Sequence, residues 1–500
     1  MLEKADIPRF AFSPPRGLCV LMSILGRRDV DEEGRAFMPV ETIADSKAEQ
    51  PTDKFLGVAV AVSFLVFVSG LDVTVVAAVA PIVAEDLGDA AITGLGIGGI
   101  SVMVSIILSE TVPLKSRALW HSTGKLVGGV AMALGGPLGG FLTDTYHWRA
   151  AFLLQVPFAL MCIVVTLYAV RSPSSLTEPR SAPLKALDIW GCILLPMTLI
   201  PLLLGFSTFS NIILAGDETP HARVPIYILA ATSVVAGAAF CHAESTATNP
   251  IISVRLFRSP NVGSICLLQF FAALVHYAIL YTAPVFAIII SHASTTSAGV
   301  SIMPVSLAAC IGTLAAGVHI SRTGKYKTLL LVGAMSVTVG PLAFVYVLNI
   351  QTGTPAYTIA RILSSFPATF GFQLTNSVSV VALLALCSAT DIAGLTSHAS
   401  LFKSLGGVIG TALSAILIQM FLSWELSRNI FGDNRQYIDA IKASARDLSG
   451  LPTEIQAVGQ SIWQHSFVYM FGTLAAISAL NIGLAIWGVS EIDIGNAGGL

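Results

Sequence analysis

The segment VGSICLLQFFAALVHYAILYTAPVFAIII, residues 262–290, decides the fold class of this chain. It contains no Asp, Glu, Lys or Arg. A helix needs about 20 apolar residues to cross the hydrocarbon core of a bilayer, so this segment is long enough to span a membrane. We therefore predict a transmembrane helix here and use the same length criterion for the rest of the chain.

Eleven further segments meet that criterion, which gives about twelve predicted spans. The composition agrees, because 54% of the 500 residues are apolar and only 11% are charged, whereas soluble domains carry about 25% charged residues. We predict an all-α polytopic membrane protein. The other predicted spans cover roughly residues 55–84, 92–109, 126–143, 150–170, 187–209, 225–241, 299–320, 328–348, 357–386, 394–422 and 466–489.

Several function classes are excluded by the composition and by missing motifs. The net charge is −2 and no basic face with interleaved aromatic residues occurs, so we expect no nucleic-acid partner. There is no HExxH, GxSxG or Walker sequence, so we expect neither an enzyme nor ATP-driven work. The seven cysteines form no CxxC pair, so we expect no metal and no other cofactor. Ion or proton gradients remain as the energy source.

Lysine and arginine in the short loops predict the orientation, because cytoplasmic loops carry an excess of these residues. Threading the spans in order places two basic turns on one side: Lys115 with Arg117, and Arg322 with Lys325 and Lys327. We predict that this side is cytoplasmic and that both termini lie there. Two cytoplasmic tails follow, the first disordered, at residues 1–54 and 491–500.

Asp72 is the first candidate for a functional side chain, because it lies within the first predicted span. A charged carboxylate near the centre of a bilayer costs about 2.5–3.5 kcal/mol on insertion scales, so such residues usually face a cavity or a partner. Asp72 either binds substrate or protons, or it fixes packing by hydrogen bonds to a neighbouring helix.

Four other polar residues are candidates for a substrate or proton pathway. Gln373 and Asn376 are three residues apart, so they share a helix face and either line a polar cavity or bond a neighbouring helix. His276 lies beside Tyr277, in an aromatic group that is more typical of packing than of a ligand site.

Arg361 and Lys403 lie near the ends of predicted spans. Long cationic side chains in such places usually extend to the membrane interface, and we favour that position for both over a functional one.

The segment GGPLGG, residues 135–140, is the candidate gating element. Pro137 removes a backbone donor and bends a helix. Gly135, Gly136, Gly139 and Gly140 allow a neighbouring helix to approach closely. Further kinks are expected at Pro284, Pro304, Pro341 and Pro367, where we favour local packing over gating.

Taken together, several segments resemble the fungal major facilitator superfamily, in its drug:proton antiporter branch with fourteen spans. Residues 71–87, LDVTVVAAVAPIVAEDL, resemble the first-helix motif and place Asp72 at its acidic position. GGPLGG resembles the antiporter motif of the fifth helix, and WRAAFLLQVP at 148–157 the start of the sixth. FKSLGGVIGTAL at 402–413 resembles the eleventh-helix segment. The chain looks closest to vacuolar basic amino acid transporters and to multidrug or mycotoxin efflux pumps.

The resemblance has one large gap. Leu87, at the end of the first-helix motif, is followed almost at once by Gly94, where the fourth family helix begins. The second and third family helices are therefore missing, which leaves twelve spans where fourteen are expected. Ala90 and Thr93 stand where the family has the arginine and glutamine tied to proton coupling.

The resemblance implies a two-bundle architecture, with a depleted N-terminal bundle at 55–170, a linker with two transmembrane helices at 171–260 and a six-helix C-terminal bundle at 261–490. It implies a monomeric secondary transporter, with a small-molecule substrate, protons and the lipid bilayer as partners. One hypothesis is proton-coupled export of drugs, toxins or secondary metabolites at the plasma membrane. The alternatives are a vacuolar basic amino acid transporter and a non-transporting membrane sensor or inactive short form.

Overall fold

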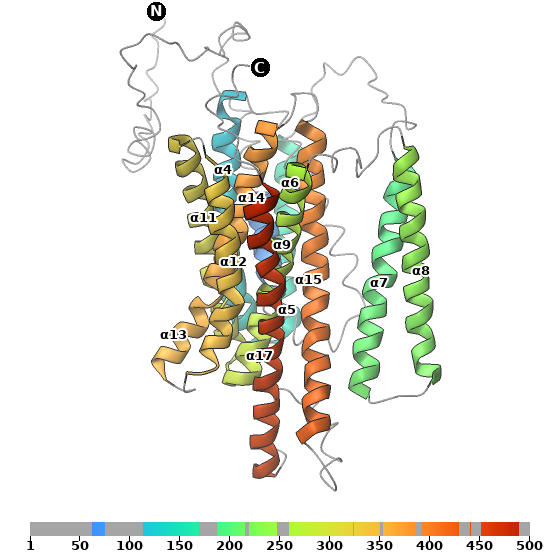
Figure 1. Cartoon of the computed structure of the whole chain (residues 1–500). Helices are drawn as coiled ribbons and strands as arrows, with labels where there is room; N and C mark the ends of the chain where they lie inside the picture. The colour runs from blue at the N-terminus through green and yellow to red at the C-terminus, as the bar shows by residue number, and fades with distance from the viewer. Residues whose placement is uncertain are drawn as a thin grey trace, which may run out of the picture. The chain divides into compact units, whose positions relative to one another are not determined.

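A computed structural model describes residues 63–75, 114–169, 188–215, 220–247, 260–323, 325–350, 354–386, 392–429, 441 and 452–489. The predicted span at 92–109, both predicted tails and the substituted positions Ala90 and Thr93 lie outside these described residues. Within the described ranges every regular element is a helix, which confirms the all-α prediction (Figure 1).

The described helices follow one another along the chain in this order. An apolar helix at Ser63–Val75 comes first. The labelled helices are α4 (Leu114–Thr145), α5 (Trp148–Leu153), α6 (Gln155–Ala169), α7 (Ile189–Ala215), α8 (Pro220–Thr246), α9 (Pro260–Ser291), α10 (Thr295–Val300), α11 (Met303–Thr323), α12 (Lys327–Val347), α13 (Pro355–Leu363), α14 (Ser365–Leu386), α15 (Ile392–Asn429), α17 (Thr453–Gly483) and the π-helical turn η5 (Leu484–Gly488).

Eight helices in the described part of the chain are long and apolar enough to cross a membrane. One of them, Pro260–Ser291, contains the segment that predicted the fold class. The predicted spans at 126–143 and 357–386 lie in α4 and in α13 with α14, outside that set of eight. The predicted first span at 55–84 is described only as the helix Ser63–Val75.

One predicted basic turn is helical in the structure. Lys115 and Arg117 were expected in a basic turn, but α4 already begins at Leu114. Lysine and arginine are good helix formers, and a helix can continue beyond the bilayer, so the positive charge alone did not mark a turn. The helices at the predicted spans 394–422 and 466–489 also extend beyond the predicted limits, because α15 continues to Asn429 and α17 begins at Thr453. Of the other predicted basic turn, Lys325 lies in the connection between α11 and α12, while Arg322 is in the last turn of α11 and Lys327 is the first residue of α12.

Three helix breaks each lie four residues before a proline: Leu153 before Pro157, Val300 before Pro304, and Leu363 before Pro367. A proline ring clashes with the carbonyl of the residue four positions earlier and offers no N–H to bond it. At Pro304 and Pro367, where kinks were predicted, the regular helix is interrupted for one or two residues, between α10 and α11 and between α13 and α14. Pro284 and Pro341 lie inside the continuous helices α9 and α12.

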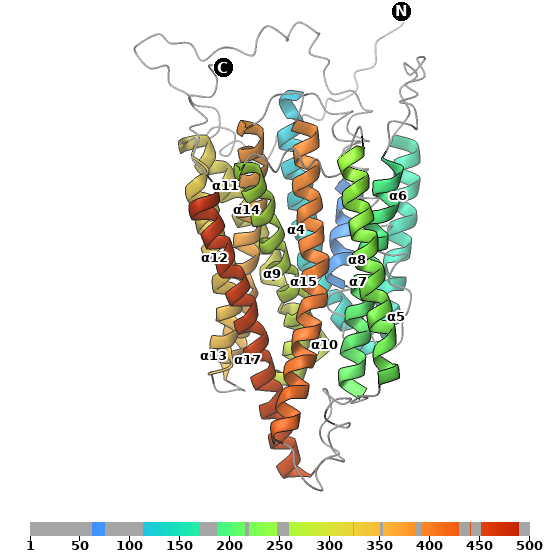
Figure 2. The ribbon, with the colours of Figure 1, turned by 45° about the vertical axis from the view of Figure 1, so that its right-hand side comes forward.

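The helix α9 is the most deeply buried of the spanning helices. Of its apolar window 83% is buried, against 11% for α7, whose apolar side chains are left to contact lipid. The α9 helix packs against α14, α15 and α17 (Figure 2). The Phe286 ring meets Phe344, Phe467 and Phe471 at centroid distances of 5.6, 5.3 and 6.0 Å, and these edge-on contacts stabilise the packing around α9.

Candidate functional site

The helix α4 is held between two other parts of the chain. On one side it meets the helix Ser63–Val75, and on the other it packs against α10 and α11. By the predicted domain division, these two sides belong to the N-terminal and the C-terminal bundle. The glycines of GGPLGG, which we call the α4 glycines (Gly135, Gly136, Gly139 and Gly140), make both approaches possible.

The α4 glycines alternate between the two neighbours. A Cβ added to Gly135 would lie 2.5 Å from the carbonyl oxygen of Leu71. One added to Gly136 would lie 2.6 Å from the carbonyl oxygen of Gly299 in α10. Real Cβ atoms do not approach backbone that closely, so each position needs a residue without a side chain.

The other two positions follow the same pattern at a spacing of one helical turn. Gly139 faces Val75 of the first helix, and a Cβ added to Gly139 would lie 3.2 Å from the Val75 Cα. Gly140 faces α10, with 2.7 Å from its added Cβ to the Thr296 Cα. The predicted close-approach role of GGPLGG is thus visible, with Pro137 inside the continuous helix.

Asp144 joins the end of α4 to α10. Its carboxylate accepts hydrogen bonds from the backbone N–H groups of Thr295, at 3.1 Å, and Thr296, at 2.7 Å, and from the Thr296 hydroxyl at 2.7 Å. Desolvation raises the pKa of Asp144, but the hydrogen bonds from Thr296 and Thr295 outweigh it, so the pKa lies below its ordinary value. The sequence offered no signal for this contact, because 151 residues separate the partners.

Asp72 lies partly buried on the first helix and takes part in a small polar cluster. Its carboxyl interacts with the side chain of Gln155 at the start of α6 and lies within electrostatic range of Tyr281 on α9. Gln155 is buried, and its Nε2 has no hydrogen bond of normal length. With Tyr277, one turn before Tyr281, these residues form what we call the central polar cluster: Asp72, Gln155, Tyr277 and Tyr281.

His276 lies in the core between α9 and α14. Its ring stacks on Phe372 at a centroid distance of 4.4 Å, and its Nδ1 lies 3.3 Å from the Thr369 hydroxyl. Tyr277 meets the His276 ring edge-on at 5.0 Å. These contacts are those of a packed core, and Tyr277 connects that core to the central polar cluster.

Gln373 and Asn376 share a face of α14 and each bonds a neighbouring helix. Gln373 Nε2 donates to the Thr313 hydroxyl of α11 at 3.1 Å. Gln269 of α9 donates to Asn376 Oδ1 at 3.4 Å. Of the two roles expected for this pair, the structure shows the interhelical one.

Arg361 does not extend to the membrane interface, so that prediction is wrong. Its side chain is buried, with 3% exposure, and it donates to two serine hydroxyls. Lys403 is partly buried in α15. Nowhere in the described ranges do three or more His, Cys, Asp or Glu side chains gather as metal ligands would.

Comparison with known proteins links this geometry to a family. The sequence model of the Major Facilitator Superfamily matches residues 87–411, well over half of the chain. This range contains the α4 glycines and Asp144 and ends within α15.

Three of the curated relatives come from two yeasts. Multidrug resistance protein fnx1 of Schizosaccharomyces pombe is 28% identical over 391 residues, which cover 78% of this chain and 72% of the relative. Vacuolar basic amino acid transporter 2 of Saccharomyces cerevisiae is 28% identical over 354 residues, which cover 68% of this chain and 72% of the relative. Vacuolar membrane amino acid uptake transporter fnx2 of Schizosaccharomyces pombe is 25% identical, over 73% of this chain and 62% of the relative.

Solved structures show the same fold. A bacterial homologue of the human lysosomal transporter Spinster, in an inward-facing and unoccupied conformation, superposes with a TM-score of 0.51 at 13% identity. The match covers 87% of this chain and 97% of that one. At this identity the likeness concerns the fold alone.

Proposed function

Because this chain belongs to the Major Facilitator Superfamily, we propose that it is a secondary active transporter that exports small organic molecules in exchange for protons. Drugs, toxins or secondary metabolites are the proposed substrates, and the similarity to multidrug resistance protein fnx1 supports this choice. The chain is an integral multi-pass membrane protein. We further propose that it acts as a monomer with both termini in the cytoplasm.

The central polar cluster is the observation that carries the proposal. Asp72 is a carboxylate within an apolar helix, and it interacts with Gln155 and lies near Tyr281 on a helix of the other predicted bundle. A carboxylate in such a place is costly to insert and is retained where it serves a function. Movement of one bundle against the other would change its surroundings, so its proton affinity would differ between two conformations.

We propose that the two bundles move against each other where α4 contacts the first helix and α10, and we call these contacts the α4 seam. At the α4 glycines the backbone of α4 lies directly against the first helix and against α10. At one end of the seam, the Asp144 side chain is hydrogen-bonded to α10. Transporters of this kind alternate access by rocking two bundles around a site near the middle of the membrane. We propose that this structure represents a conformation in which the two bundles are in contact at the Asp144 end of the seam.

A second candidate function is the transport of basic amino acids into the vacuole. Its support is the similarity to vacuolar basic amino acid transporter 2 and the acidic side chain in the central polar cluster, which would attract a cationic substrate. A third candidate is a non-transporting sensor or inactive short form. Its support is the resemblance to the fourteen-span branch, by which Ala90 and Thr93 would stand in place of the coupling residues and two family helices would be missing.

One experiment separates these candidates. The chain is expressed in a fungal host that lacks its own exporters, and the pH-dependent accumulation of arginine, lysine and several xenobiotics is measured in cells and in isolated vacuoles. Extrusion of xenobiotics by cells supports the exporter, and uptake of arginine or lysine by vacuoles supports the second candidate. No flux by a folded, inserted chain supports the third. Sequencing the transcript tests whether the missing helices are natural.

A further inference from the structure

Arg361 is a buried cation, and the hydrogen-bond partners of its guanidinium within the described residues are neutral. Its Nη1 donates to the Ser301 hydroxyl at 2.7 Å, and its Nη2 donates to the Ser297 hydroxyl at 3.1 Å. Its Nε is buried without a hydrogen-bond partner, and within the described residues no carboxylate forms a salt bridge with it. Hydroxyl groups satisfy donors but bring no negative charge, so the burial of this guanidinium is only partly compensated.

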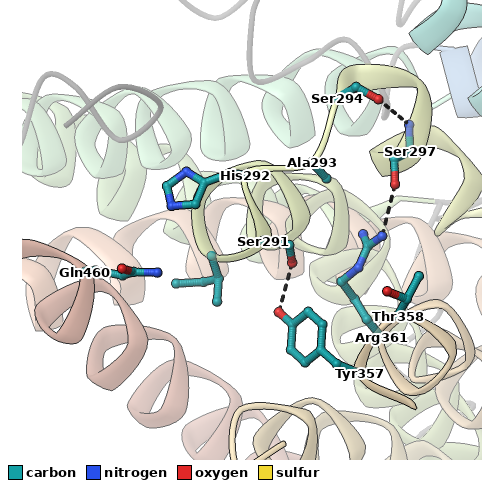
Figure 3. Close-up of a pocket in the computed structure, with 10 residues that line it drawn as sticks. Ser291, His292, Ala293, Ser294, Ser297, Tyr357, Thr358, Arg361 and Gln460 are labelled. Carbon is teal, nitrogen blue, oxygen red and sulfur yellow. Dashed lines mark hydrogen bonds between the residues drawn. The ribbon is translucent and has the colours of Figure 1, made fainter. Parts of the chain in front are cut away.

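A cavity of about 440 Å³ lies beside this cation (Figure 3). The buried side chains of Ile290, Tyr357 and Arg361 form its inner part. The exposed side chains of His292 and Thr358 lie at its rim. Ser291, Ala293, Ser294, Ser297 and Gln460 complete the lining, and we call the whole the Arg361 cavity. Its volume falls in the range of about 300–1,000 Å³ that small-molecule sites occupy.

Two interrupted helices contact each other beside this cavity. The break between α10 and α11 and the break between α13 and α14 are held together by a bond from the Ser365 hydroxyl to the Ser301 carbonyl oxygen, at 3.2 Å. Arg361 lies just before the second break and bonds Ser301 at the first. Broken helices that line a cavity are a common way for transporters to hold charged groups.

The inner wall of the cavity is fixed in place by its own hydrogen bonds. The Tyr357 hydroxyl lies 2.8 Å from the Ser291 hydroxyl at the end of α9 (Figure 3). The Tyr357 N–H bonds the Thr354 hydroxyl, which caps α13 at 3.2 Å. The Tyr357 ring and the Arg361 guanidinium lie one helical turn apart on α13. They therefore give the cavity an apolar surface and a positive charge whose positions are fixed before any ligand binds.

We propose that the Arg361 cavity binds a small organic carboxylate. The carboxylate would pair with the Arg361 guanidinium, which still has free N–H donors, and an apolar remainder would lie against Tyr357 and Ile290. A carboxylate fits best for two reasons. Its two oxygens can accept from two parallel N–H groups of arginine, and its negative charge neutralises the guanidinium, which the serine hydroxyls cannot do.

The probe is benzoate, compared with benzamide, which has the same ring and nearly the same shape but no charge. Binding is measured by calorimetry on the full chain in nanodiscs of phosphatidylcholine, without any gradient, so the result does not depend on transport. We expect benzoate to bind about tenfold to a hundredfold more tightly than benzamide, as for a hydrogen bond to a charged group. Arg361→Gln should remove this preference.

Two variants of one residue at the rim of the Arg361 cavity test the proposal even if Arg361→Gln does not fold. Thr358 is exposed and lies one turn before Arg361 on α13. Thr358→Glu would provide a tethered carboxylate, so we expect a higher thermal midpoint without ligand and a loss of benzoate binding. Thr358→Gln has the same size as Thr358→Glu and no charge, so it measures the effect of the larger side chain alone, and both the rise in thermal midpoint and the loss of benzoate binding should be smaller in it than in Thr358→Glu.

Three results would overturn the proposal. The first is equal affinity for benzoate and benzamide, or no benzoate binding at all. The second is benzoate binding that survives in both Arg361→Gln and Thr358→Glu. The third is stabilisation by nanodiscs that contain phosphatidylserine with no response to benzoate, because the anion recognised would then be a lipid headgroup.

Discussion

Asp144 Oδ2 accepts two hydrogen bonds from Thr296, one from its backbone N–H and one from its hydroxyl, both at 2.7 Å. The two residues lie on α4 and α10, 152 positions apart in the chain. Asp144 is exposed, so its charge adds little free energy here. The geometry of the contact, in contrast, fixes how far the ends of α4 and α10 can separate.

Asp144→Asn should loosen this end of the seam. Asparagine keeps the shape but loses the charge, and its amide nitrogen cannot accept a hydrogen bond, so at least one of the three hydrogen bonds is lost. We expect a longer and broader distance distribution between spin labels at Tyr146 and His292, measured by double electron–electron resonance. Thr145→Val is the control, because the Thr145 hydroxyl bonds only the Phe141 carbonyl oxygen of its own helix. An unchanged distribution in Asp144→Asn would show that Asp144 does not hold the seam.

The pH dependence of the same distance follows from the lowered pKa of Asp144. A depressed carboxyl pKa stabilises the contact above the ordinary value of about 3.9, and the contribution is lost as the pH falls through the lower, folded-state pKa. The label distance should therefore be constant between about pH 8 and pH 5 and should lengthen only below about pH 4. A transition between about pH 5 and pH 7 would contradict this account of the contact.

Alanine at Gly140 should be strongly destabilising, whereas alanine at Gly317 should not. The added Cβ at Gly140 meets the Thr295 carbonyl oxygen and Thr296 Cα of α10, while at Gly317 in α11 it meets nothing within 4 Å. We expect a lower thermal midpoint and a wider α4–α10 distance for Gly140→Ala. Gly317→Ala should be neutral or slightly stabilising, since alanine favours helix by about 1 kcal/mol over glycine. Equal effects of the two substitutions would contradict close packing of α4 against α10.

His276→Leu should affect stability rather than coupling. The substitution removes the stack on Phe372 and the contact with the Thr369 hydroxyl, which together contribute about 1–2 kcal/mol. The thermal midpoint should fall, while the pH dependence of transport should not shift. His221 is exposed, so the control variant His221→Gln should change neither property. A shifted pH profile in His276→Leu would return His276 to the proton pathway.

The sequence predicts the helices better than it predicts their partners. The segment at 262–290 became α9, Pro260–Ser291, nearly unchanged, because uncharged length alone determines such a helix. The breaks at Val300 and Leu363 could also have been placed, since each lies four residues before a proline. Pattern analysis located these prolines but expected them only to kink the helices.

Arg361 marks the limit of prediction from sequence. Its position near the end of a predicted span favoured an interfacial side chain, and the structure buries it instead. Its partners Ser297 and Ser301 are 64 and 60 residues away, so no local pattern connects them. Asp72 shows the opposite case, because the cost of an intramembrane carboxylate singles it out without any knowledge of its neighbours.

The central claim is that the Asp72 carboxyl takes up and releases a proton during transport. The most direct measurement is substrate flux driven by an imposed pH gradient in proteoliposomes, with the substrate identified in cells, for the parent chain and for Asp72→Asn. The account predicts that Asp72→Asn still binds substrate and still exchanges it across the membrane without a gradient, but loses the flux that the pH gradient drives. Gradient-driven flux that is the same in Asp72→Asn and the parent chain would contradict it.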